Sequence, residues 1–117
     1  MESGSVGAWL DVADARELQH LRRLVVSVTE PDEHEILLLW VRGRVVAVEN
    51  VCPHAASALT DAKVSRRTLT CRVHGLSFDL TSGRQRRRPY QAAAGPLTRF
   101  RTRIDAGRVQ VELSPLP

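Results

Sequence analysis

The sequence contains Cys52-Pro53-His54 and, after a gap of sixteen residues, Cys71-Arg72-Val73-His74-Gly75. Each stretch offers one thiolate and one imidazole at a point where strand-forming residues give way to a loop. Four such side chains can bind a tetrahedral zinc ion or an iron–sulfur cluster. In small zinc sites with two cysteines and two histidines, the cysteines usually form one pair and the histidines the other. Here each stretch carries one of each, which favours a two-iron cluster with both cysteines on one iron and both histidines on the other.

Apolar and β-branched runs on both sides of these stretches predict antiparallel strands. Two pairs of runs are joined by short turns, Arg42-Gly43 and Asp105-Ala106-Gly107. Because glycine readily adopts the positive φ that tight turns require, each pair is predicted to form a β-hairpin. The expected strands are residues 23–28, 35–41, 44–49, 78–80, 98–104 and 109–113.

Residues 14–24 differ from the rest and predict one short helix of one or two turns. Apolar residues recur every three positions from Ala15 to Leu21, and Asp11 or Asp14 precedes them as a candidate N-cap. Strands joined by short turns, with at most one short helix, indicate an all-β fold built as a barrel or a sandwich.

Length and composition favour one cytoplasmic domain over residues 1–117. The chain is 43% hydrophobic and 26% charged, which is ordinary for a globular protein. Its longest apolar run, Ile36 to Val41, is far shorter than the ~18 residues of a membrane span. Residues 1–5 show neither the basic nor the apolar region of a signal peptide. Two cysteines are too few for a disulfide scaffold, so metal binding is the better interpretation in a reducing compartment.

Charge is distributed unevenly along the chain. Residues 1–62 carry five arginines and ten acidic residues, a balance of −5, whereas residues 63–117 carry twelve basic and three acidic residues, a balance of +9. The basic excess is densest from Arg84 to Arg88. A basic half of this kind suits nucleic acid, an anionic surface or an acidic protein partner.

At the cysteine and histidine stretches the sequence resembles the Rieske family. The family pattern is Cys-x-His, a gap of similar length, then Cys-x-x-His followed by glycine and an aromatic–aspartate pair. The matching residues are Cys52, His54, Cys71, His74, Gly75, Phe78, Asp79 and Gly83. The resemblance implies that Cys52 and Cys71 bind the inner iron of one 2Fe-2S cluster, and that His54 and His74 bind the outer iron.

The resemblance also implies a fold, and it extends over the whole chain. The expected fold is Rieske-like: all-β, with antiparallel sheets in a barrel-like sandwich and a small inserted cluster-binding subdomain. The cluster-binding loops are expected at about residues 50–60 and 70–80, and a proline-bearing loop at about 84–96. Residues 9–12 match the opening strand of the family and residues 108–113 its closing strand.

Several positions depart from the family pattern. The first loop has Ala56 and Ala62 where glycine is common, so its backbone is expected either to avoid strongly positive φ there or to be slightly re-routed. Ser57 and Val73 stand where high-potential members have a disulfide. Leu76 and Phe78 stand where those members have hydroxyl donors to the cluster. Fewer donors predict a potential at the low end of the ~−150 to +300 mV Rieske range.

The resemblance implies a soluble ferredoxin, an electron-transfer protein rather than an enzyme. Such a protein carries single electrons from a flavin-dependent ferredoxin reductase to a terminal oxygenase. The arginines at 86–88 predict that the partner presents an acidic docking patch. A monomer is expected, with neither membrane nor nucleic acid as a partner. No residue is expected to be catalytic, because the sequence has no phosphate loop, nucleophile elbow or helical His-Glu-x-x-His.

Two other functions remain open at this point. The chain is alternatively the small Rieske subunit of an oxidoreductase such as nitrite reductase, in which case a large siroheme-containing chain would accompany it. It is alternatively a zinc-stabilised module whose Arg84–Arg88 run binds nucleic acid, in which case the protein would be colourless. The remaining histidines, His20 and His34, lie in polar surroundings and are expected at the surface.

Overall fold

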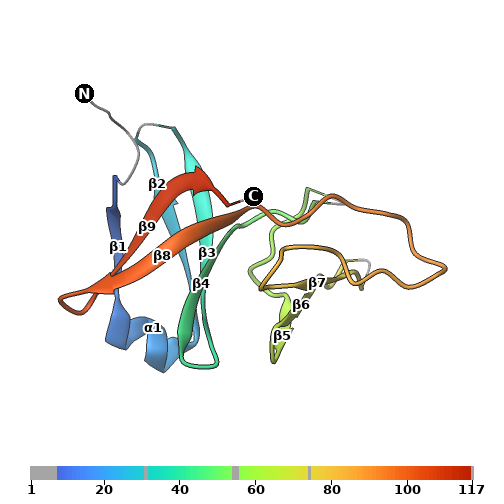
Figure 1. The fold of residues 1–117 in the computed structure, drawn as a ribbon, viewed down its shortest axis with the longest axis horizontal. Helices are drawn as coiled ribbons and strands as arrows, with labels where there is room; N and C mark the ends of the chain where they lie inside the picture. The colour runs from blue at the N-terminus through green and yellow to red at the C-terminus, as the bar shows by residue number, and fades with distance from the viewer. Residues whose placement is uncertain (1–7, 31, 54–55, 74, 117) are drawn as a thin grey trace.

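The computed structural model describes residues 8–30, 32–53, 56–73 and 75–116, which form two antiparallel sheets side by side (Figure 1). The larger sheet has six strands in the order β1-β9-β8-β4-β3-β2, and the smaller has three in the order β5-β6-β7. The strands are β1 (Leu10–Asp14), β2 (Arg23–Val28), β3 (His34–Val41), β4 (Arg44–Glu49), β5 (Lys63–Ser65), β6 (Thr68–Thr70), β7 (Ser77–Asp79), β8 (Arg99–Asp105) and β9 (Arg108–Pro115). The strands β1 and β2, at opposite ends of the larger sheet, contact each other, so this sheet curls into a near-barrel.

The two predicted hairpins, β3–β4 and β8–β9, are confirmed. In the first turn Arg42 and Gly43 have φ values of 52° and 79°, and in the second Ala106 and Gly107 have values of 50° and 78°. Two successive residues with positive φ give a turn whose twist matches that of the flanking strands. The glycine in each turn therefore identified a real hairpin.

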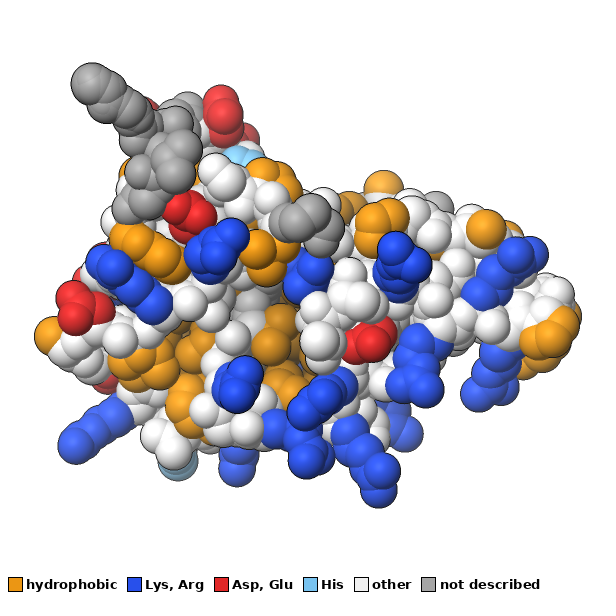
Figure 2. Space-filling view, in the orientation of Figure 1, with side chains coloured by type: hydrophobic (Ala, Val, Ile, Leu, Met, Phe, Trp, Pro, Cys, Tyr) orange, Lys and Arg blue, Asp and Glu red, His pale blue; other side chains and the backbone are white. Residues whose placement is uncertain are grey.

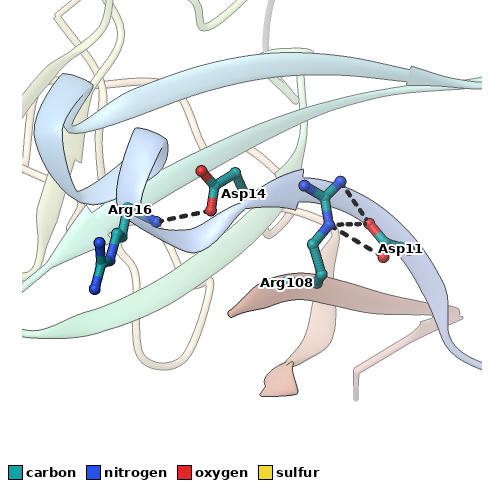
Figure 3. Close-up of polar contacts among 4 residues, drawn as sticks. All are labelled: Asp11, Asp14, Arg16 and Arg108. Atoms are coloured by element: carbon teal, nitrogen blue, oxygen red, sulfur yellow. Dashed lines mark hydrogen bonds and ion pairs between the residues drawn. The ribbon is translucent and has the colours of Figure 1, made fainter. Parts of the chain in front are cut away.

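The predicted helix is α1 (Ala15–Leu21), which contacts β1, β2 and β3 at one end of the near-barrel (Figure 1). Asp14 is the N-cap, and its Oδ1 accepts a hydrogen bond from the Arg16 backbone N–H at 3.3 Å (Figure 3). The helix ends where Arg22 turns left-handed with a φ of 74° and its N–H donates to the Leu18 carbonyl. It stops short of Leu24 because β2 begins directly after this turn.

The other candidate cap, Asp11, instead joins β1 to β9. Its carboxylate accepts two hydrogen bonds from Nε of Arg108, at 2.9 and 3.2 Å, and Nη2 of Arg108 lies 2.8 Å from Oδ1 (Figure 3). The side-chain hydrogen bond that Arg108 donates to Asp11 raises the pKa of Arg108 above its usual value. The Arg108 guanidinium therefore stays positively charged beside the Asp11 carboxylate.

The strand β3 separates two apolar cores. Its residues Ile36 to Leu39 are all buried, and successive side chains of a strand point to opposite faces. Ile36 and Leu38 pack inside the near-barrel with Val109 and Val111. Leu37 and Leu39 pack on the other face, in the core shared with the smaller sheet. The apolar run of β3 thus reflects burial on both faces.

The smaller sheet is inserted between β4 and β8, as the family resemblance implied. Val64, Leu69 and Phe78 pair across its three strands and face the shared core. The strands β5 and β6 were not predicted from the sequence, because each has three residues and a single apolar side chain, too short for a periodic pattern. Among the described residues, no helix has the length and hydropathy to cross a bilayer.

Candidate metal centre

The two cysteines lie at equivalent places at the junction of the two sheets. Cys52 follows β4, and Cys71 follows β6 directly. Each is only 1% exposed, and both belong to the apolar core between the sheets. The fold therefore brings together two thiols that are nineteen positions apart in the sequence.

Each cysteine begins a loop closed by the same two backbone hydrogen bonds. In the first loop, residues 52–57, the Cys52 N–H donates to the Ser57 carbonyl at 2.7 Å, and the Cys52 carbonyl accepts from the Ala56 N–H at 3.0 Å. In the second loop, residues 71–76, the Cys71 N–H donates to the Leu76 carbonyl at 2.8 Å, and the Cys71 carbonyl accepts from the Gly75 N–H at 2.9 Å. Each cysteine is therefore the first residue of a loop closed by the same pattern of backbone hydrogen bonds.

The fifth residue of each loop is left-handed, and one expectation from the sequence is wrong here. Gly75 has a φ of 66°, and Ala56 has a φ of 53°, so the first of the two alternatives expected for this loop, avoidance of positive φ, is wrong at Ala56. The left-handed turn at the fifth residue redirects the chain, so that the carbonyl of the sixth residue accepts the hydrogen bond from the cysteine N–H. Alanine adopts the turn at a cost of about 1–2 kcal/mol, which loop closure offsets. The expectation holds for Ala62, which does not have positive φ.

Asn50 organises the first loop, a role that the sequence analysis missed. Its side chain is buried, donates from Nδ2 to Glu35 Oε1 and Thr60 Oγ1, each at 2.9 Å, and accepts at Oδ1 from the Leu59 N–H at 2.8 Å. These bonds connect β3, the start of the loop and its end. A polar residue directly after the apolar β4 and two positions before Cys52 was the only signal in the sequence.

Arginine and glutamine side chains bind the second loop to its surroundings from outside. Nε of Arg72 donates to the Asp61 carbonyl, which joins the second loop to the segment that follows the first. Nε2 of Gln91 donates to the Gly75 carbonyl at 3.4 Å, which places the segment at 84–96 beside the second loop. The segment expected to be the proline-bearing loop is joined to the second cysteine loop by this hydrogen bond.

The donors at this place suit a 2Fe-2S cluster. The buried thiols offer two candidate ligands in apolar surroundings, each at the start of a loop closed by backbone hydrogen bonds. Ser57 Oγ is buried and has no hydrogen-bond partner among the described residues. An unpartnered buried hydroxyl costs about 1–3 kcal/mol, so its position fits a site completed by a group that accepts hydrogen bonds. The other two predicted ligands, His54 and His74, lie outside the described residues.

Apolar side chains are exposed next to both cysteine loops. Val51 precedes Cys52 and is 37% exposed, and Val73 lies within the second loop and is 55% exposed. Tyr90, on the neighbouring segment, is 77% exposed.

The two remaining histidines differ from each other. His20 is exposed on α1, as expected. The expectation for His34 is wrong: its Nδ1 lies 3.1 Å from Glu49 Oε1, and its ring packs edge-on against Phe100 with a centroid distance of 5.9 Å. The cross-strand neighbours that partly bury it come from β4 and β8, which the local sequence around His34 does not reveal.

Comparisons with known proteins identify similar sequences over most of the chain. The sequence profile of the Rieske [2Fe-2S] domain matches residues 8–106. The ferredoxin component of a naphthalene 1,2-dioxygenase system from Pseudomonas aeruginosa is 28% identical over 110 residues, which cover 91% of this chain and 96% of the relative. The ferredoxin component of an alkene monooxygenase system from Xanthobacter autotrophicus is 30% identical over 93 residues, which cover 79% of this chain and 73% of the relative.

A solved structure shares the fold. One chain in the complex of reduced oxygenase and oxidised ferredoxin of carbazole 1,9a-dioxygenase aligns with a TM-score of 0.75 and 22% sequence identity. The alignment covers 93% of this chain and 96% of that chain. The two sheets and the loops between them therefore follow an architecture already seen by experiment.

Proposed function

This chain belongs to the Rieske family of 2Fe-2S domains, and we propose that it carries single electrons to a terminal oxygenase. The observation that carries the proposal is the match to ferredoxin components over 91% of this chain and 96% of the relative's length. Such components are electron carriers rather than enzymes. The family match also selects a 2Fe-2S cluster over the zinc ion that the four ligands alone left open.

The proposed ligands are Cys52 and Cys71 for the inner iron and His54 and His74 for the outer iron. Support comes from the two buried thiols at the start of equivalent loops, and from the order of the four residues in the sequence. Replacing two cysteines by histidines at one iron raises the reduction potential above that of all-cysteine ferredoxins.

The residues around this site favour electron transfer over substrate chemistry. When bound, the cluster accepts and releases one electron. The apolar core around both cysteines excludes water, and the closed loops hold the thiols in fixed positions. The side chains of Leu76 and Phe78 have no hydrogen-bond donor. The more negative reduced cluster is therefore stabilised less, and the potential is expected at the low end of the Rieske range.

The proposed partners are a flavin-dependent ferredoxin reductase and a terminal oxygenase, each with an acidic docking patch. The arginines at 86–88 belong to the segment that Gln91 binds to the second loop. Arg88 also lines the same hollow as Gly75. Positive charge beside the electron-transfer site steers an acidic partner and raises its association rate, most strongly at low salt.

The proposal extends to the state of the protein. Residues 1–117 act as one Rieske domain and as a monomer in the cytoplasm. Two buried cysteines that are needed as ligands leave none for a disulfide, which suits a reducing compartment.

The test is spectroscopic and then functional. The dithionite-reduced protein is expected to give a Rieske-type EPR signal, and purification is expected to yield a monomer with reversible one-electron behaviour. Mixing with a ferredoxin reductase and its oxygenase is expected to support substrate oxidation that depends on this chain. A colourless zinc protein would contradict the cluster. Co-purification with a large siroheme-containing chain would contradict a free carrier and favour the fixed subunit of a nitrite reductase.

A further inference from the structure

The outer face of the smaller sheet is polar, and it carries no part of the metal centre. Cross-strand pairing places Lys63, Thr70 and Ser77 in one row, and Ser65, Thr68 and Asp79 in another. Since side chains alternate along a strand, these rows face away from the core that the middle row contacts. The Thr70 and Ser77 hydroxyls lie 2.9 Å apart, so the floor of this face is made of small groups that form hydrogen bonds.

Cations enclose this floor. They are Arg42 at the β3–β4 turn, Lys63 on β5, Arg66 and Arg67 at the β5–β6 turn, and the arginines at 86–88. Figure 2 shows Lys and Arg side chains gathered at the end of the molecule that carries the smaller sheet. All seven are exposed, and none forms an ion pair with a carboxylate among the described residues. This set of cations and the hydroxyl floor are called the basic trough.

The basic trough is continuous. Three adjoining hollows on this face, with volumes of about 470, 520 and 480 Å³, share lining residues. Ser77 and Arg88 belong to the first and second, and Thr68 and Arg86 belong to the second and third. The first hollow also includes Gly75 of the second cysteine loop, so the trough runs from the metal centre to the β5–β6 turn.

Some of the cations are positioned. Arg86 Nη1 donates to the Thr68 hydroxyl at 3.1 Å, Arg87 Nε donates to the Gln91 carbonyl at 2.8 Å, and Arg88 Nη1 donates to the Tyr90 hydroxyl at 3.3 Å. Each bond uses one guanidinium nitrogen and leaves others for a ligand. The one carboxylate of the face, Asp79, accepts from the Thr81 N–H and lines none of the three hollows.

We propose that the basic trough binds an extended acidic segment of the redox partner, in addition to contacts at the metal centre. That the ligand belongs to a redox partner rests on the proposed function, whereas its acidic character is inferred from the trough itself. Carboxylates match guanidinium groups and hydroxyl donors, and the three hollows together far exceed the volume of a single anion. Single-stranded nucleic acid is disfavoured because Tyr90 is the one aromatic side chain that lines the hollows, and base binding needs stacking surfaces.

The trough is tested with a fluorescein-labelled peptide of ten glutamates and the oxidised, cluster-loaded full chain. Fluorescence anisotropy reports binding at low and high salt. The double variant R66Q/R67Q changes the end of the trough farthest from Gly75. As a matched control, R16Q/R22Q removes the same charge from α1 and its C-cap. Two lost surface ion pairs are expected to weaken binding about threefold to tenfold in the trough variant. The control is expected to change binding less than about twofold, because screening limits its effect at a distance.

Two results would overturn the proposal. One is equal weakening in the trough variant and the control, which would mean that only net charge matters. The other is tighter binding of a ten-nucleotide thymidine oligonucleotide than of the peptide, with the same dependence on the trough arginines. Cluster absorbance checks that each variant is folded. If R66Q/R67Q loses its cluster, the single variant Lys63→Gln is compared with the single control Arg16→Gln instead. The assay needs no electron transfer, so failure of the carrier role and failure of the trough are separate outcomes.

Discussion

The two cysteine loops have the same backbone hydrogen bonds, yet different residues hold them in place. The first loop is supported from inside by the buried side chain of Asn50 and accepts a left-handed alanine, Ala56. The second loop has Gly75 at the equivalent position and is supported from outside by Arg72 and Gln91. One geometry is thus reached through a buried polar network in one loop and through glycine and surface contacts in the other. The first loop should be the more sensitive to substitution.

The largest expected effect is loss of the cluster, and it is expected for the proposed ligands of both loops. Cys52→Ala and Cys71→Ala are each expected to abolish the cluster, and His54→Ala and His74→Ala to abolish it or convert it, because in the proposed assignment each loop supplies one ligand to each iron. Iron content and the EPR spectrum of the reduced protein measure the loss. His20→Ala, at an exposed position on α1, is the control and keeps the signal. A normal Rieske signal in the His74 variant would refute the ligand assignment.

The second prediction separates the loops by their supports. Asn50→Ala is expected to lower the free energy of unfolding by about 2–4 kcal/mol, because it removes three hydrogen bonds and leaves the buried Leu59 N–H without a partner. Gln91→Ala removes a longer, exposed bond to Gly75 and is expected to cost about 1 kcal/mol or less. Urea unfolding followed by cluster absorbance compares them. Equal losses in the two variants would mean that the first loop does not depend on Asn50 in this way.

The third prediction adds hydrogen-bond donors near the second loop. Leu76 and Phe78 are buried in the core that contains both cysteines. Leu76→Ser and Phe78→Tyr are each expected to raise the reduction potential, since a donor stabilises the more negative reduced cluster. A net hydrogen bond of about 1 kcal/mol corresponds to ~40 mV for a one-electron couple. Redox titration measures the shift. No rise in either folded variant would show that these positions do not face the cluster.

The fourth prediction removes a donor from the first loop. The Ser57 hydroxyl is buried without a partner among the described residues. If it donates to the cluster, Ser57→Ala lowers the potential by up to ~40 mV. Ser65→Ala, which removes an exposed hydroxyl from the smaller sheet, is the matched control and leaves the potential unchanged. An unchanged potential in the Ser57 variant, with the cluster intact, would show that the Ser57 hydroxyl does not affect the reduction potential.

The smallest expected effects are changes in stability when the two left-handed residues of the loops are substituted. Ala56→Gly is expected to stabilise the protein by up to about 1 kcal/mol, because glycine adopts positive φ without the alanine penalty and loses only part of that gain to chain entropy. Gly75→Ala is expected to destabilise it by about 1 kcal/mol. A Cβ at Gly75 meets no atom within 4 Å, so backbone strain alone sets this cost. Thermal unfolding of both variants tests the opposite signs, and shifts in the same direction would contradict the equivalence of the loops.

The sequence by itself determined what depends on local pattern. Glycine at Gly43 and Gly107 predicted the two hairpins, because a positive φ is a property of one residue and its neighbours. The order and spacing of Cys52, His54, Cys71 and His74 indicated the cluster and the family, because the family's loops are short and continuous in sequence. The apolar run of β3 predicted a strand because this pattern also lies in consecutive residues.

Only the tertiary structure decided what depends on residues distant in sequence. Asn50 became a support because Glu35 and Thr60 come to its side chain, and His34 is partly buried because Glu49 and Phe100 pack beside it. The short strands of the smaller sheet exist because their neighbours supply the hydrogen bonds that three residues cannot supply alone. The basic trough likewise depends on strand register, which places cations from four separate segments around one hydroxyl floor. Burial and register depend on the packing of the whole chain, and a local sequence pattern does not contain that information.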